Sequence, residues 1–201
     1  LIYIIFAKSE DKLYISNKNR QAYFVLLSVC IIFVRINLKN CNVMFDKETY
    51  VQRRALLKKN IGSGVLLFLG NDEQGLNYED NAFRYRQDST FLYYFGLSFA
   101  GLSAIIDIDE DKEIIFGDEL TIDHIVWMGT QPTLKEKSER VGIRETLPSV
   151  AIISYLHKAV QKGQTVHYLP PYRPEHKLKL MDWLGIPPAR QEGSVPFILS
   201  L

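Results

Sequence analysis

The chain has 201 residues, which is enough for one sizeable hydrophobic core and a short additional segment. Its formal net charge is +1, with 47% hydrophobic and 23% charged residues, so no global field would attract nucleic acid or an anionic membrane. Cys30 and Cys41 both precede Met44, which excludes a disulfide scaffold and a cysteine-ligated zinc site from the rest of the chain. We therefore expect a protein of a reducing compartment, without nucleic-acid or membrane partners.

Residues 1–43 differ from the rest in composition. They carry a net charge of +4 and lack glycine and proline, whereas the remainder carries −3. The apolar run from Ala22 to Val34 is shorter than the roughly 20 residues that span a membrane. It resembles the apolar core of a signal peptide, but no cleavage site of small residues follows it. We favour translation from upstream of a start at Met44 over a signal peptide, and a signal peptide over an anchor. This leader is expected to lie outside the fold, and the mildly acidic body suits a cytoplasmic protein.

The first expected helix covers residues 45–60 and ends at a Gly-Ser-Gly sequence. Its inward positions are Tyr50, Leu56 and Leu57. Arg53 and Arg54 are expected to be solvated on the opposite face. The apolar run 65–69 that follows is bounded by glycines and is typical of a strand buried on both faces.

Further elements follow a polar loop over residues 70–81. The aromatic run 91–95 is expected to be extended. Residues 102–108 and 113–116 flank the acidic turn at 109–111 and predict a β-hairpin.

The second half of the body alternates helices and strands. A short helix is expected over 118–128, a longer one from Pro148 to Lys162, a strand over 165–169 and a helix over Pro174 to Leu184. This alternation, together with the hairpin, predicts a layered α/β domain with a mixed β-sheet. The Pro- and Gly-rich residues that follow, 185–193, are typical of a linker.

Four side chains suggest a metal site, namely Asp118, Glu119, Asp123 and His124. On a helix, the adjacent Asp123 and His124 point about 100° apart and do not share a face. A carboxylate pair without a histidine partner is weak support for zinc, so a solvated acidic face is the favoured interpretation.

Other motifs give no active site. The Gly62-x-Gly64 pair precedes a strand, whereas a phosphate-binding loop follows one. His157, His167 and His176 lack a metal-ligand spacing, so we interpret them as surface or hydrogen-bonded histidines. A nucleophilic serine would need a sharp, glycine-flanked turn, which the sequence does not contain. We predict that no catalytic residue or metal ligand lies in this chain.

Residues 80–96 combine carboxylates, arginines and aromatic rings, and two interpretations stay open for them. They are either a packed edge segment in which Arg86 pairs with Asp88, or a recognition surface, since Arg and Tyr are common interface anchors.

This segment resembles the Phe-Arg-x-x-Ser-x-Phe-x-Tyr-x-x-Gly signature of the aminopeptidase P N-terminal domain, with Tyr85 in place of the first Phe. The matching positions are Tyr85, Arg86, Asp88, Ser89, Phe91 and Tyr93. The Arg53-Arg54 pair, the strand 65–69 and the Trp-x-Gly element at Trp127 agree with the same family in the same order.

The resemblance implies a three-layer α/β/α domain with a mixed sheet over residues 44–184, followed at 185–201 by the start of a linker to a catalytic domain outside this chain. That domain is expected to hold two manganese ions and to remove N-terminal residues that precede proline. The chain alone is expected to be inactive. The resemblance also implies homodimers or homotetramers in which Asp80 and Trp127 line a neighbouring subunit's active site and limit substrate access.

Two alternatives remain. A homologue without metal ligands would use the same architecture to bind peptides or proteins, and a prolidase would carry the same N-terminal layer with a different substrate. The signature stretch favours aminopeptidase P over creatinase but separates it less well from prolidase.

Overall fold

The computed structural model describes residues 44–78, 81–122, 126, 129, 131–193 and 197. The leader at 1–43 and the two gating candidates Asp80 and Trp127 lie outside these residues, as does part of the helix expected over 118–128. Within the described part, no helix is long and apolar enough to cross a membrane.

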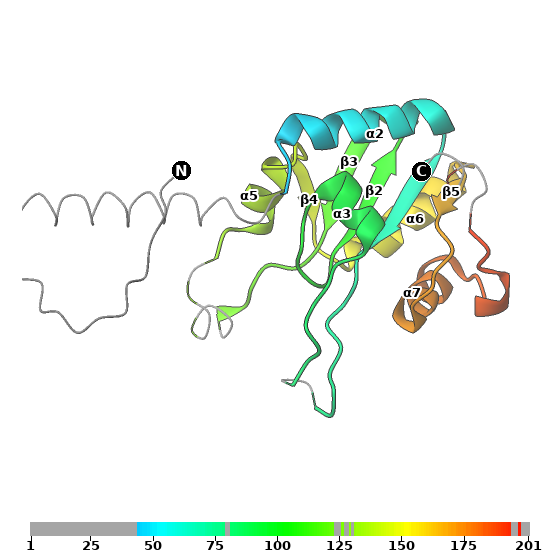
Figure 1. Ribbon diagram of the computed structural model, residues 1–201. Helices are drawn as coiled ribbons and strands as arrows, with labels where there is room; N and C mark the ends of the chain where they lie inside the picture. The colour runs from blue at the N-terminus through cyan, green and yellow to red at the C-terminus, as the bar shows by residue number, and fades with distance from the viewer. Residues whose placement is uncertain are drawn as a thin grey trace, which may run out of the picture. The chain divides into compact units, whose positions relative to one another are not determined.

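The body is built on a five-stranded mixed sheet with the order β4-β3-β2-β1-β5 (Figure 1). β1 pairs antiparallel with β2 and β2 antiparallel with β3, while β5 joins β1 and β4 joins β3 in parallel. The expected hairpin and the buried first strand are confirmed. The strands are β1 (Val65–Leu69), β2 (Ser103–Asp107), β3 (Lys112–Phe116), β4 (Glu145–Leu147) and β5 (Val166–Tyr168).

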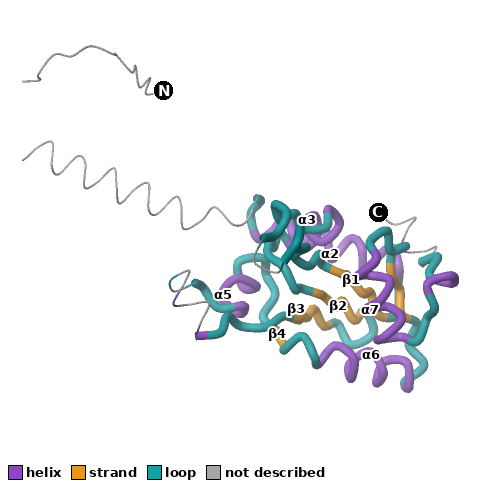
Figure 2. Tube along the Cα trace, turned by 90° about the horizontal axis from the view of Figure 1, so that it is seen from below, coloured by secondary structure: helices purple, strands orange, loops and turns teal. Residues whose placement is uncertain are grey.

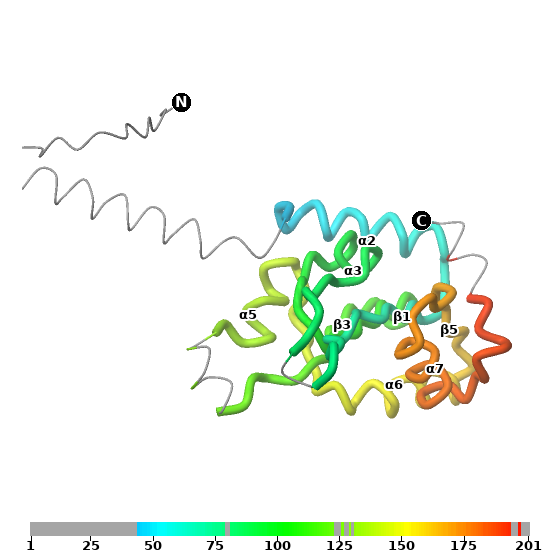
Figure 3. The backbone as a smooth tube through the Cα atoms, turned by 60° about the horizontal axis from the view of Figure 1, so that its bottom comes forward, coloured from blue at the N-terminus to red at the C-terminus, as the bar shows by residue number. Residues whose placement is uncertain are grey.

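Helices cover both faces of the sheet, which confirms the three-layer arrangement (Figures 2 and 3). Side chains alternate along β1, so Leu66 and Phe68 point to one face and Val65 and Leu67 to the other. The first layer holds α2 (Lys47–Ile61), α3 (Ser89–Phe95) and α5 (Leu134–Glu139). The second layer holds α6 (Ala151–Gln161) and α7 (Pro174–Leu184).

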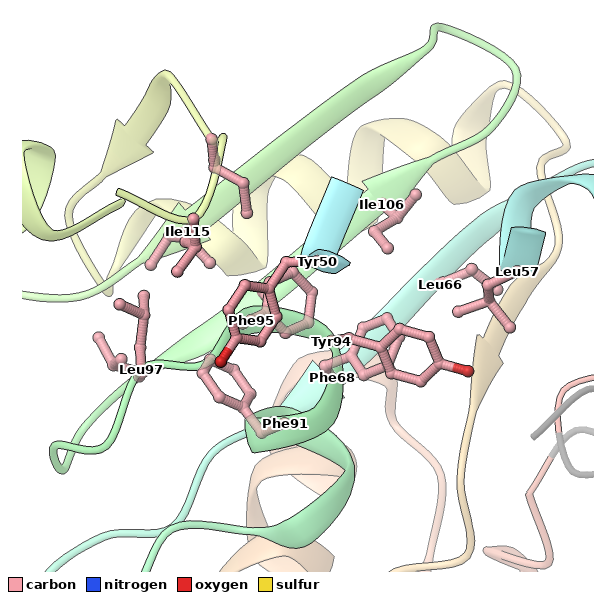
Figure 4. Close-up of a cluster of buried hydrophobic side chains, with 14 of the residues drawn as sticks. Tyr50, Leu57, Leu66, Phe68, Phe91, Tyr94, Phe95, Leu97, Ile106 and Ile115 are labelled. Carbon is pink, nitrogen blue, oxygen red and sulfur yellow. The ribbon is translucent and has the colours of Figure 1, made fainter. Parts of the chain in front are cut away.

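The core of the first layer is rich in aromatic rings (Figure 4). The ring of Phe68 lies 5.4 Å from that of Tyr94 and 5.0 Å from that of Phe95, both on α3. Such tilted and edge-on contacts add to the free energy of area burial. Helix α3 is therefore fixed on the sheet directly beside β1.

Helix α2 buries Tyr50 and Leu57 as expected, but two of its other positions correct the prediction. Leu56 is 60% exposed, and Arg54 is completely buried instead of solvated. The Arg54 guanidinium donates to Glu113 Oε2 at 2.8 Å and to two backbone carbonyl oxygens at 2.9 and 3.0 Å. These bonds satisfy the buried charge and tie α2 to β3 and to the loop after α5.

The expectation of an extended aromatic run at 91–95 is wrong, because residues 89–95 form α3. Asp88 caps this helix by accepting from the backbone N–H groups of Thr90 and Phe91 at 2.9 and 3.0 Å. Gly96 ends it in the left-handed conformation. The short elements α5 and β4 were also not expected from the sequence.

The residues expected to form a linker contribute to the fold. A 3₁₀ helix, η1 (Pro188–Arg190), precedes the buried Gln191, which donates to the carbonyl oxygens of Lys177 and Ile186 at 2.9 and 2.7 Å. Phe197 is fully buried, with its ring 5.1 Å from that of Phe68. The first-layer core thus includes a side chain from beyond residue 184.

Candidate functional site

A hairpin projects from the sheet between β1 and α3 (Figure 1). We call its described residues, 72–78 and 81–86, the arm. Its two sides are joined by the bridge between Gly75 and Ala82. Backbone bonds from Leu76 N to Asn81 O at 2.7 Å and from Phe83 N to Gln74 O at 2.8 Å support that bridge.

The arm presents large apolar side chains to solvent. Leu76, Tyr78 and Phe83 are 52%, 62% and 56% exposed. Three large apolar side chains are thus exposed on one projecting segment of the molecule.

The base of the arm is held by two buried amides, Asn71 and Gln87. Asn71 N donates to Gln87 Oε1 at 2.7 Å, and Asn71 Nδ2 donates to the Arg86 carbonyl at 2.8 Å. Gln87 Nε2 donates to the Phe99 carbonyl at 3.0 Å, and its Oε1 also accepts from Asp88 N at 2.9 Å. These bonds connect the two sides of the base to each other and to the body.

The signature positions divide between the base and α3. The Tyr85 hydroxyl donates to the Asn71 carbonyl at 3.3 Å, and burial raises the pKa of that hydroxyl. Arg86 is exposed and donates to Ser89 Oγ at 3.3 Å, instead of pairing with Asp88 as one interpretation required. Phe91 is buried in the core.

The arginine pair of α2 meets the end of the signature. Arg53 donates to the Tyr93 carbonyl at 2.9 Å, and its guanidinium carbon lies 4.0 Å from the ring centre of Tyr93 and 4.5 Å from that of Phe45. This cation–π stacking orders a half-exposed tyrosine on the surface. Arg54 next to it reaches inward, so the two arginines have different structural roles.

A groove of about 290 Å³ lies beside the start of α3. Its polar groups are Asp88, Thr90, Tyr172 and His176, and its walls are mainly apolar. The Tyr172 hydroxyl donates to Asp88 Oδ2 at 3.1 Å, so both carboxylate oxygens of Asp88 already have partners. His176 Nε2 lies 3.0 Å from the Gly70 carbonyl, and burial lowers the pKa of this histidine.

The two described members of the acidic group have internal partners. Asp118 accepts from the backbone and hydroxyl of Ser149 at 3.0 and 2.6 Å, and Glu119 accepts from Leu134 N at 2.8 Å. Among the side chains that the structure describes, no three His, Cys, Asp or Glu residues are placed to hold a metal ion.

The three histidines lie near backbone carbonyls, as the hydrogen-bonded interpretation predicts. His157 lies 3.2 Å from the Trp183 carbonyl, and His167 lies 3.2 Å from that of Ser63. His176 on α7 makes the corresponding contact near the base of the arm.

The fold matches solved aminopeptidases. An aminopeptidase from Pseudomonas aeruginosa aligns with a TM-score of 0.61 at 21% identity, over 76% of this chain and 35% of its own. Aminopeptidase P from Escherichia coli aligns with a TM-score of 0.59 at 18% identity, over 70% and 33%. The body therefore has the architecture of one part of these enzymes.

The sequence comparisons define the family. The model of the aminopeptidase P N-terminal domain matches residues 50–168, which is more than half of the chain. The chain therefore belongs to the aminopeptidase P N-terminal domain family.

Two curated relatives illustrate the range of that family. A probable Xaa-Pro aminopeptidase of Chaetomium globosum is 30% identical over 112 residues, which cover 54% of this chain and 18% of the relative. A human Xaa-Pro dipeptidase is 33% identical over 90 residues, which cover 43% and 18%. The chain thus matches less than a fifth of either relative's length.

Sequence reasoning missed several residues that build this site. Asn71 lies in a segment interpreted as a polar loop, and nothing in its sequence context marks it as buried. Gln87 lies within the signature stretch, so the sequence marked this position as part of the site, but it did not indicate that the side chain is buried and bonds to Asn71. Asp88 followed by an aromatic run and Gly96 is a helix-capping pattern that could have indicated α3.

Proposed function

We propose that this chain is the non-catalytic N-terminal domain of a manganese-dependent Xaa-Pro aminopeptidase, which removes N-terminal residues that precede proline. The observation that carries the proposal is the family match over residues 50–168, which contains the whole signature stretch. The names of the curated relatives, Xaa-Pro aminopeptidases and dipeptidases, support a peptidase as the parent protein.

The described residues do not fit a manganese pair, because Asp118 and Glu119 are occupied by internal hydrogen bonds. We therefore assign both metal ions to a catalytic domain that follows this chain. There they would activate a water molecule for attack on the peptide carbonyl. On this proposal residues 185–201 lead into that domain while part of them packs on the body, and the chain alone is inactive.

The domain would serve oligomerisation and substrate gating in a cytoplasmic homodimer or homotetramer. The exposed apolar side chains of the arm support a contact surface. We retain Asp80 as a group that binds a substrate's free amino terminus or a partner arginine, and Trp127 as a ring that packs on substrate. The partners are the catalytic domain, neighbouring subunits and peptides with proline at the second position.

A prolidase is the second candidate, because the human relative at 33% identity is a dipeptidase. A third is a peptide- or protein-binding homologue that lacks the metal ligands. The three differ in what they cleave, since an aminopeptidase accepts tripeptides, a prolidase accepts dipeptides and the binding protein cleaves neither.

The test starts from the coding sequence beyond residue 201. An open frame with two Asp, one His and two Glu ligands supports a metallopeptidase, and a frame without them favours the binding protein. The extended polypeptide and the 201-residue chain are then purified, loaded with manganese and assayed on Xaa-Pro dipeptides and tripeptides. Cleavage of tripeptides by the extended form alone is the expected result. Hydrolysis by the short chain would contradict the assignment of catalysis to the following domain.

A further inference from the structure

The two buried amides at the base of the arm are unusual for a segment that is otherwise exposed. Asn71 is 4% exposed and Gln87 is 1% exposed, whereas the arm beyond them is mainly solvent-accessible. Burying an amide is unfavourable unless its hydrogen bonds are replaced within the protein. Their placement therefore needs a structural reason at this point of the chain.

The bonds of these amides cross from one side of the base to the other. Asn71 binds Gln87 and Arg86 through its backbone and side-chain nitrogens, and it accepts from Tyr85 through its carbonyl. Gln87 in turn binds the Phe99 carbonyl in the loop before β2. The two points where the arm leaves the body are thus fixed together and to the loop before β2.

Beyond the base, the arm has weaker support from the body. Asp72 pairs with Lys179 of α7 at 2.7 Å, and Gln74 Nε2 donates to Glu175 of α7 at 2.8 Å. The Gln74–Glu175 bond is exposed, so water competes with it. The direction of the arm therefore depends on the buried bonds at its base, together with the part-buried Asp72–Lys179 pair, in which Lys179 contacts both carboxylate oxygens.

We propose that Asn71 and Gln87 are positioning residues, which fix the direction of the arm and so present Leu76, Tyr78 and Phe83 to a neighbouring subunit at one angle. The inference rests on the proposed oligomerising function. We call Asn71 and Gln87 the clamp. An arm that is already ordered loses less conformational entropy when it binds, so the clamp strengthens association without contacting the partner.

The first test measures hydrogen exchange in the folded chain. Gln87→Met and Asn71→Leu remove the amides and keep a similar side-chain size, and the second variant serves if the first does not fold. We expect the amide hydrogens of Leu76 and Phe83 to exchange at least about tenfold faster, with Ile105 in β2 unchanged. The matched control Gln74→Met removes a bond of the arm outside the base, and its expected change is below about twofold. Equal exchange in the Gln74→Met and Gln87→Met variants would overturn the positioning role.

The second test separates this inference from the proposed function. Self-association of the extended polypeptide is measured by analytical ultracentrifugation for wild type, Phe83→Ser and Gln87→Met. We expect both variants to associate about tenfold more weakly. If Phe83→Ser weakens association and Gln87→Met does not, the arm is a contact surface but the clamp has no positioning role. If wild type does not associate, the oligomerising function fails and the inference fails with it. If wild type associates and Phe83→Ser has no effect, the arm is not the contact surface, and the inference fails while the oligomerising function stands.

Discussion

Replacing Arg54 by alanine tests whether a buried arginine holds α2 on the sheet. The substitution removes a guanidinium that is completely buried and leaves three acceptors without their donor, namely Glu113 Oε2 and the carbonyls of Tyr94 and Val141. Each buried group without a partner costs about 1–3 kcal/mol. The other carboxylate oxygen of Glu113 keeps its ion pair with Lys58 at 3.1 Å, which limits the loss on that side. We expect the free energy of unfolding to fall by about 3–5 kcal/mol, the usual result of removing one partner from a buried pair.

The neighbouring Arg53 provides the matched control. It makes one hydrogen bond to the backbone of Tyr93 and stacks on exposed rings, so Arg53→Ala should cost about 1 kcal/mol. Urea denaturation followed by circular dichroism gives both free energies of unfolding, provided the slopes of the transitions agree. A loss for Arg54→Ala that is no larger than that for Arg53→Ala would refute the structural role of the buried bonds.

Three further predictions use similar measurements. Gly96→Ala should lower the free energy of unfolding by about 2–4 kcal/mol, because the residue has a φ of 65° and an added Cβ would lie 2.4 Å from the Tyr50 ring. The control Gly101→Ala has a similar φ of 73° but open space around the added Cβ, so it should cost about 1 kcal/mol. Equal costs for the two variants would contradict this packing argument. Phe197→Ala should destabilise by about 3–5 kcal/mol in urea denaturation, and a change below about 1 kcal/mol would show that this ring is not part of the core. Burial lowers the pKa of His176 below its ordinary value of 6.5, so the unfolded chain binds the proton first as pH falls, and stability is lost below about pH 6.5. His176→Gln should reduce the loss of stability between about pH 7.5 and about pH 5, and an unchanged pH profile would contradict it.

Elements with strong local signals could be predicted from the sequence. Strand β1 is a continuous apolar run between glycines, and the β2–β3 hairpin surrounds an acidic turn. Helix α7 begins at Pro174 and ends before Gly185, whose φ is 67°. In each case the residues that determine the boundary lie within or next to the element.

Features that depend on distant partners could not be predicted in this way. Arg54 contacts residues that lie 40, 59 and 87 positions away, so its helical surroundings alone favoured a solvated position. Aromatic composition favoured a strand at 91–95, whereas burial of Phe91, Tyr94 and Phe95 follows the helical spacing. The local pattern was ambiguous, and the caps decided in favour of the helix.

The candidate site shows the same division. The signature stretch located the base of the arm and the start of α3, but the partners of Asn71 lie across the hairpin and have no sequence pattern. Asp80 and Trp127 came from the family resemblance alone and stay predictions. The exposed positions of the arm depend on its projection from the sheet, which composition does not specify.

Residues 80–96 divide into a part whose contacts are explained by the fold and a part for which we propose a recognition role. Gln87, Asp88 and Phe91 fix the base of the arm, cap α3 and fill the core, so their part of the signature is explained by the fold. Phe83 lies before them on the arm and is 56% exposed, so burial in the fold does not explain a large aromatic side chain at this position. A substitution at Asp88 should therefore act through stability, whereas one at Phe83 should act through association and leave stability within about 0.5 kcal/mol of wild type. Measuring both quantities for both positions separates the folding role of the signature from the recognition role of the arm.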